Sequence, residues 1–232
     1  MKKYLAIAAV TFLALAGTKH FMPKTTITDT TTSLFGSGVV NSSIAVCVPK
    51  MYPVPLLNQE CTVTLSGNIE MPAAYAKLLG LLRDANYGDT VTILLAGNGG
   101  AVDGEDAIAQ AIKDSKAHVI TYAIGNVYSA HAYLTLAGDE IKLANNITLM
   151  FHRAAMEDGS TLKDGAALCA GQIGIDRGQD KHQKCLDYFN AQLKQEEVFL
   201  ASMKHFFTDK QYQDILDGHD VYITSAELAK RI

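Results

Sequence analysis

Residues 90–100 read TVTILLAGNGG, an apolar run that ends in a glycine-rich turn. Its first part, Thr90–Leu95, is typical of a buried strand in a parallel sheet. A second apolar run, His118–Ile124, follows after Glu105–Lys113, which has helical spacing. Because two parallel strands need a crossover connection, we expect a βαβ unit here.

The alternation of strands and helices continues on both sides of this unit. The further expected elements are a strand over Thr62–Gly67, a helix over Pro72–Ala85, a short helix over Ser129–Leu136, and strands over Glu140–Ala144 and Ile147–Phe151. Repeated βαβ units predict an α/β fold around a parallel sheet. After Arg153 the sequence changes to polar segments with helical spacing, Leu162–Cys169 and Lys181–His205. They predict a C-terminal helical appendage, inserted at about residues 160–205.

The composition is that of a folded domain. Hydrophobic residues make up 48% of the chain and charged residues 19%, which excludes general disorder. The formal net charge is −4, whereas nucleic-acid binding needs clustered positive charge. We therefore expect no nucleic-acid partner.

The first 16 residues have the pattern of a secretory signal peptide. Two lysines precede an uncharged apolar run, Tyr4–Ala16, which ends in the small-x-small sequence Ala14-Leu15-Ala16. The run is shorter than the ~20 residues that span a bilayer as a helix. Cleavage after Ala16 would make the protein periplasmic or secreted. An uncleaved membrane anchor and a cytoplasmic amphipathic start are the alternatives.

The sequence between this segment and the first regular strand predicts an extended arm. Residues 17–60 include a stretch rich in Thr, Ser and Gly, and the folded domain is expected over 61–232. In an oxidising compartment Cys47 could pair with Cys61 and Cys169 with Cys185, although the sequence does not fix the connectivity. None of these cysteines has CxxC spacing, so no metal site is expected.

Two glycine-containing turns at the ends of buried strands could serve chemistry. Gly97–Gly100 lets the backbone pass close to a ligand, although ordinary turn geometry explains it as well. Gly125–Ala130 joins a strand to a helix and places Ser129 near the positive end of the helix dipole. An N-cap serine is the simpler interpretation of Ser129.

A histidine ends the last apolar strand of this series. His152 lies in Met150–Arg153, where a packed, hydrogen-bonded histidine is the common alternative to a catalytic base. His131 is two residues from Ser129, a separation that points side chains away from each other on a helix. His152 is therefore the stronger choice for a base.

In their order and spacing, these segments resemble the Clp protease proteolytic subunit family of the ClpP/crotonase superfamily. Leu94–Gly100 is similar to the family's strand and PGG turn, and Gly125–Ala130 to its G-x-A-A-S-M motif. Met150–Arg153 is similar to its M-I-H-Q motif. Asp217 lies upstream of Tyr222–Glu227, which resembles the family's late Phe-x-Ser-Ala-Glu segment.

The resemblance covers the chain from about Cys61 to the C-terminus, with some departures. Asn98 replaces the proline of the turn, and Val127-Tyr128 replaces the small pair before the serine. The stretch from His152 to Asp217 is longer than usual, in line with an insertion.

The resemblance implies a serine endopeptidase with a Ser-His-Asp triad, in which Ser129 attacks the peptide carbonyl after His152 removes its proton. Asp217 would orient the imidazole; Asp220 is the alternative, and a solvent-exposed turn aspartate the simpler interpretation of Asp217. The related signal peptide peptidases use a Ser-Lys dyad, so the His152 motif favours the triad.

For substrate binding, the resemblance implies an oxyanion hole made by the backbone amides of Gly100 and Ala130. Gly99 and Ala101 would contact an extended substrate by strand addition. Short or unfolded peptides are the expected substrates and a homo-oligomer the expected assembly, with no cofactor and no metal.

Two other functions are compatible with the same fold. A catalytically inactive ClpP-like oligomeric scaffold or binding protein would retain the fold without the chemistry. A crotonase relative acting on acyl-coenzyme A would use the same main-chain donors for a thioester enolate. The serine–histidine combination and the expected export disfavour the second of these.

Overall fold

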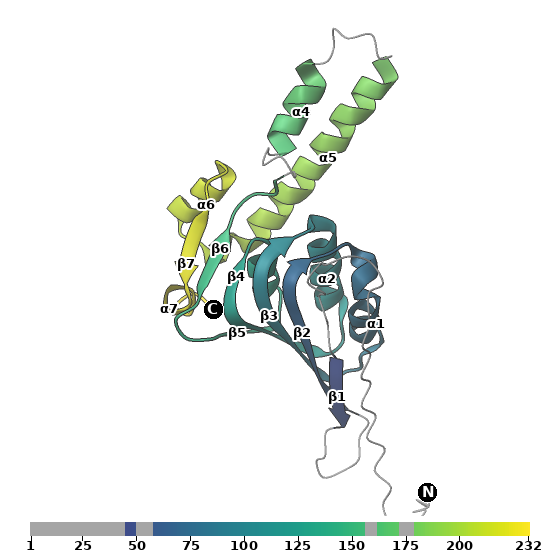
Figure 1. Cartoon of the computed structure of the whole chain (residues 1–232), viewed down its shortest axis with the longest axis vertical. Coiled ribbons are helices and arrows are strands. Elements are labelled where there is room, and N and C mark those ends of the chain that lie inside the picture. Colours follow the sequence, from purple (N-terminus) through teal and green to yellow (C-terminus); the bar gives the residue numbers. More distant parts are fainter. Residues whose placement is uncertain (1–44, 50–57, 156–161, 172–178) are drawn as a thin grey trace, which may run out of the picture.

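The computed structural model describes residues 45–49, 58–155, 162–171 and 179–232. In this part of the chain a seven-stranded sheet has the order β1-β2-β3-β4-β6-β7, and β5 pairs with β4 beside that path (Figure 1). The strands are β1 (Ala45–Pro49), β2 (Gln59–Ile69), β3 (Thr90–Gly100), β4 (His118–Tyr128), β5 (Glu140–Leu143), β6 (Thr148–Phe151) and β7 (Val221–Thr224).

The centre of the sheet is parallel and its two edges are antiparallel. Strands β2, β3 and β4 run parallel, as do β5 and β6 beside β4, whereas β1 and β7 are antiparallel to their neighbours. Along β3, Val91, Ile93 and Leu95 are buried and the residues between them are half-buried. The predicted α/β fold with a parallel sheet is confirmed.

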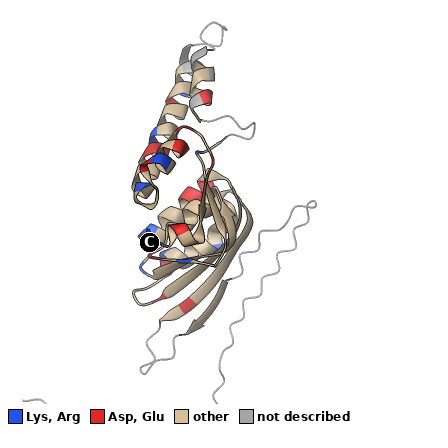
Figure 2. Ribbon diagram, turned by 90° about the vertical axis from the view of Figure 1, so that its left-hand side faces the viewer, with Lys and Arg blue, Asp and Glu red and all other residues tan. Residues whose placement is uncertain are grey.

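Helices connect the strands and supply the rest of the core. They are α1 (Ala76–Asp84), α2 (Val102–Asp114), α3 (Ala130–Thr135), α4 (Leu162–Gly171), α5 (Gln179–Met203), α6 (Asp209–Leu216) and α7 (Ser225–Leu228), with 3₁₀ turns at Pro72–Tyr75 and Lys204–Phe206. Leu82, Ile108 and Leu134 from the first three helices are in the same core as the buried residues of β3. Figure 2 shows few charged residues on the strands, whereas the helices carry both acidic and basic residues.

The sheet begins earlier in the chain than the sequence predicted. Residues 45–49 of the expected arm form β1, which places Cys47 directly opposite Cys61 of β2. These two cysteines form a disulfide, and Cys169 of α4 forms another with Cys185 of α5. The expected signal peptide, with its alternatives, lies outside the described residues.

Helices α4 and α5 form a hairpin that projects from the body of the molecule (Figure 1). They correspond to the two polar helices that the sequence predicted, and their ends differ from the predicted ones by at most two residues. The C-terminal part of α5 belongs to the body, since Leu200 is buried in its core. None of the helices in the described ranges is both long enough and apolar enough to cross a membrane.

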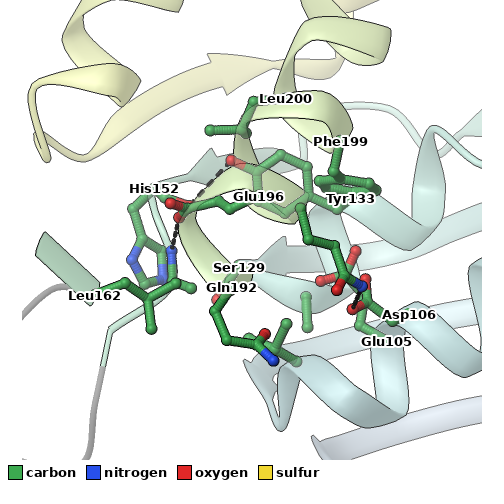
Figure 3. A pocket seen from close by; sticks show the side chains of 14 residues that line it. Glu105, Asp106, Ser129, Tyr133, His152, Leu162, Gln192, Glu196, Phe199 and Leu200 are labelled. Carbon is green, nitrogen blue, oxygen red and sulfur yellow. Dashed lines mark hydrogen bonds between the residues drawn. The ribbon is translucent and has the colours of Figure 1, made fainter. Parts of the chain in front are cut away.

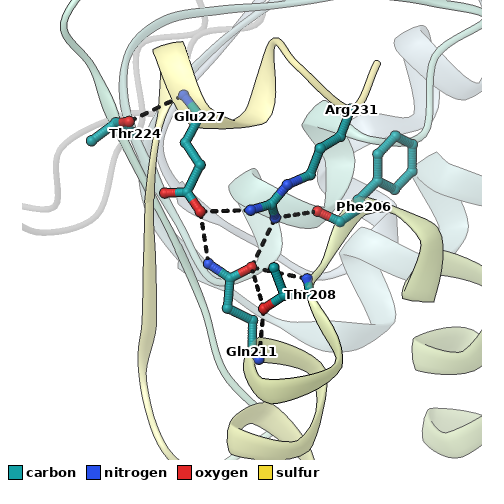
Figure 4. Close-up of polar contacts among 6 residues, drawn as sticks. All are labelled: Phe206, Thr208, Gln211, Thr224, Glu227 and Arg231. Carbon is teal, nitrogen blue, oxygen red and sulfur yellow. Dashed lines mark hydrogen bonds and ion pairs between the residues drawn. The ribbon is translucent and has the colours of Figure 1, made fainter.

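A polar cluster fixes the C-terminal elements to one another (Figure 4). The Arg231 guanidinium donates to the Phe206 carbonyl at 2.8 Å, to Gln211 Oε1 at 2.8 Å and to Glu227 Oε1 at 2.6 Å. Thr208 and Gln211 form a capping box at the start of α6. This cluster determines where α6 and the aspartates that follow it lie.

Candidate active site

One open cavity holds both Ser129 and His152 (Figure 3). The empty space between its walls, with the open mouth included, is about 570 Å³. Its walls come from α2, α3, the segment after β6, α4 and α5. The lining residues are Val102, Glu105, Asp106, Ser129, Ala130, Tyr133, His152, Ala154, Leu162, Gln192, Gln195, Glu196, Phe199 and Leu200.

Ser129 occupies a strained turn between β4 and α3. Its φ of 54° and ψ of −126° lie in a region that residues with a Cβ rarely adopt. Its N–H donates to the Met150 carbonyl of β6 at 2.8 Å, which holds the turn in place. A Cβ added to Gly99 would lie only 2.5 Å from Ser129 Cβ, so the glycine makes room for the serine. Such a sharp strand-to-helix turn is the geometry that presents a nucleophilic serine.

His152 follows β6 directly and its backbone is fixed by Tyr133. The Tyr133 hydroxyl donates to the His152 carbonyl at 3.0 Å. The Tyr133 ring packs edge to face against Phe151 and Phe199, at centroid distances of 5.2 and 5.3 Å. The half-buried His152 ring is thus held in the wall of the pocket that contains Ser129 (Figure 3).

The structure does not bring the predicted acid to this pocket. Asp217 is exposed at the C-terminal end of α6, and its Oδ1 accepts a hydrogen bond from Gln213 Nε2 at 2.9 Å. Asp220, the alternative, is exposed as well, and neither residue lines the cavity. The assignment of Asp217 as third member of a triad stays a prediction.

The predicted oxyanion donors differ in their placement. Ala130 lines the pocket as the first residue of α3, where backbone N–H groups have no acceptor within the helix. Gly100 is exposed, with a φ of 142°, and pairs with Ile69 of β2 outside the lining of the cavity.

The amides of the two residues predicted to bind substrate already have acceptors within the protein. The Gly99 N–H donates to His131 Nδ1 at 3.2 Å. The Ala101 N–H donates to the Ile69 carbonyl at 2.8 Å. Substrate contacts by Gly99 and Ala101 therefore stay a prediction, and these N–H groups are not free to make them.

His131 is a positioning residue for the glycine turn. It is fully buried, and burial lowers its pKa to about 4. Because Nδ1 accepts the Gly99 N–H, the proton of the neutral ring is on Nε2. His131 is not among the residues that line the cavity, and its Nδ1 is occupied by Gly99, so His152 remains the candidate base.

Lowering the pH from 6.5 to 4 is expected to reduce the free energy of unfolding through His131. The unfolded chain takes up a proton near pH 6.5, which the folded protein rejects until about pH 4, so stability falls over this window. The contribution is about 3 kcal/mol. Urea unfolding of wild type and His131→Asn at several pH values measures it, because the variant should lose this part of the pH slope. His219→Asn, at an exposed site, is the control, and equal slopes for wild type and His131→Asn would contradict the prediction.

The sequence interpretation missed the acidic and helical walls of the pocket. Glu105 and Asp106 come from the N-terminal part of α2, and Gln192, Gln195 and Glu196 from α5. One signal for Glu105 was available: it precedes Ile108 by three residues, which places both on the same buried face of the helix.

The Clp protease family model matches residues 50–166, half of the chain. The match includes the glycine turn, the Ser129 turn and the His152 strand. A search of curated proteins gave no match. By this match and by its fold, the chain belongs to the Clp protease family, a family of peptidases.

Proposed function

We propose that this protein is an exported serine endopeptidase that hydrolyses peptide bonds in short or unfolded peptides. The observation that carries the proposal is the placement of Ser129, in a strained strand-to-helix turn, in the same pocket as His152. Strain at a residue with a side chain is retained where the surrounding structure enforces it, and functional sites are such places.

In the proposed reaction, Ser129 Oγ attacks the carbonyl carbon of the scissile bond while His152 takes the hydroxyl proton. His152 then returns the proton to the leaving amine, and water hydrolyses the acyl-enzyme by the same steps in reverse. The Ala130 amide, with that of Gly100, would stabilise the oxyanion; one such donor contributes about 3–4 kcal/mol in known enzymes.

Export is supported by the two disulfides and by the signal-like start of the chain. Cys47–Cys61 and Cys169–Cys185 would be stable in an oxidising compartment such as the periplasm. Members of the family are generally oligomeric, and we propose a homo-oligomer here as well.

A fluorophosphonate probe tests the nucleophile directly. We expect the purified protein to gain one adduct by intact mass, located on Ser129 by peptide mapping. Ser129→Ala should gain none, while its thermal unfolding stays unchanged. Absence of labelling in the wild type at every assembly state would contradict the proposal and favour the inactive scaffold.

The Asp217→Asn variant tests whether Asp217 is the acid of the proposed triad. Loss of about 10⁴-fold in kcat is the effect known for such a carboxylate and would establish Asp217 in this role. A kcat near that of the wild type would show that Ser129 and His152 work without it. Asp220→Asn is the matched comparison, at an exposed position three residues away.

A further inference from the structure

Two carboxylates line the pocket from the N-terminal part of α2. Glu105 is only 4% exposed, and its Oε1 has no hydrogen-bond partner in the structure. Asp106 is half-buried, and its Oδ2 accepts a hydrogen bond from Gln195 Nε2 of α5 at 3.1 Å. Figure 3 shows both on the side of the pocket opposite His152.

These two acidic side chains have no compensating cation in the pocket. Arg153, the nearby buried arginine, donates Nε to Glu196 at 2.9 Å and also pairs with it through Nη2. Its Nη1 donates to the Leu216 carbonyl at 3.2 Å. Among the described residues that line the cavity, His152 is the only one that can carry a positive charge.

A buried carboxylate oxygen without a partner is costly, and a bound cation is one way in which that cost is relieved. The remaining walls suit a long side chain that carries a charge at its end. Val102, Tyr133 and Phe199 offer apolar surface against which methylene groups can pack. A terminal ammonium or guanidinium would then reach the carboxylates and form charge-assisted hydrogen bonds.

We propose, on the basis of the proposed peptidase function, that Glu105 and Asp106 form a specificity site for a lysine or arginine side chain of the substrate. The relevant residue is the one whose carbonyl Ser129 attacks, since its Cα is bonded directly to the attacked carbon. The enzyme therefore cleaves after basic residues.

The preference for a basic side chain should increase with pH, because Glu105 is buried. Burial, together with the charge of Asp106, raises the pKa of Glu105 well above 4.5. Glu105 is therefore protonated over a wider acidic range than an exposed glutamate, and it becomes a partner for a cation only as the pH rises. Besides Asp106, the titratable lining groups are Tyr133, Glu196 with its partner Arg153, and His152. The two peptides of a pair are cleaved by the same catalytic groups, so the ratio of their kcat/KM values reports on the binding of the side chain that differs.

The test compares kcat/KM for peptides that differ only in the residue before the scissile bond: lysine against norleucine, and arginine against citrulline. At pH 8 we expect the basic member of each pair to be preferred on the order of 100-fold. The preference should decrease as the pH is lowered. Glu105→Gln should lose most of the preference and its pH dependence.

Asp103→Asn is the matched control, because Asp103 is in the same helical turn but is exposed and outside the pocket lining. It should keep the wild-type preference. Glu105→Gln should unfold at the same or a higher temperature at pH 8, because it removes a buried charge. Equal rates for lysine and norleucine peptides, or an unchanged ratio in Glu105→Gln, would overturn the specificity site.

The two proposals fail separately. If the protein is labelled but shows no preference for basic residues, only the specificity site is wrong. If it is not labelled and does not cleave, calorimetry with the uncleaved lysine and norleucine peptides still measures the acidic site: tighter binding of the lysine peptide, lost in Glu105→Gln, supports it, and equal binding overturns it.

Discussion

The His152→Ala variant is expected to lose kcat on a peptide substrate by a factor on the order of 10⁶. Among the described residues that line the pocket, His152 is the only histidine, so the variant has no imidazole to take the Ser129 proton. The fold should persist, because the contact that fixes this position uses the His152 carbonyl and not its ring. Steady-state kinetics with a fluorogenic peptide, together with thermal unfolding, measure both effects.

His219→Ala is the matched control, since His219 is exposed and away from the pocket lining. It should retain kcat within a factor of about two. The double variant Ser129→Ala/His152→Ala should be little slower than either single variant, because residues that act as one unit are not additive. A His152→Ala enzyme with kcat within tenfold of the wild type would show that another group serves as the base.

The central strands of the fold could be predicted because their apolar runs are long and end in glycine-containing turns. Thr90–Leu95 and His118–Ile124 lie within β3 and β4. The structure extends β3 to Gly100, because Gly99 and Gly100 continue the pairing with β2. That extension depends on a neighbouring strand, which local sequence does not reveal.

The edge strands could not be predicted in the same way. β7 has four residues and β1 five. β7 pairs with β6, which is far from it in the chain, and β1 pairs with β2. The position of β7 follows from the long-range pairing of Thr148 with Thr224, and not from its own composition.

Of the candidate site, the sequence indicated Ser129 and His152, the proposed nucleophile and base, and both line one pocket of the structure. The sequence did not indicate that residues of α5 form one wall of this pocket. Glu196 meets Arg153 across 43 residues of chain, and no local pattern of α5 distinguishes its pocket face from its exposed face. The acid is the remaining difficulty: the family resemblance assigned Asp217 to the site, whereas its side chain is exposed, accepts from Gln213 and does not line the pocket. The Leu216 carbonyl before it nevertheless accepts from Arg153, next to His152.

Removing one partner of the Arg153–Glu196 ion pair is expected to lower the free energy of unfolding by about 3–5 kcal/mol. The side chains are only 4% and 9% exposed, so Glu196→Leu would leave a buried guanidinium without its counter-charge. Glu196 Oε1 also accepts the Ala154 N–H at 2.8 Å, two residues beyond His152. The same variant should therefore lower kcat by loosening the segment that holds the base.

Urea unfolding at neutral pH measures the effect, and a double-mutant cycle isolates the pair. Arg153→Met/Glu196→Leu should recover much of the loss, because replacing both charges removes the unpaired ion. Lys210→Met is the comparison, since the Lys210–Asp214 pair has side chains 83% and 32% exposed and should contribute less than about 0.5 kcal/mol. If Glu196→Leu costs no more than Lys210→Met, the buried pair does not hold α5 against the His152 segment, and the pocket wall must be stabilised by the apolar contacts of Phe199 and Leu200 alone.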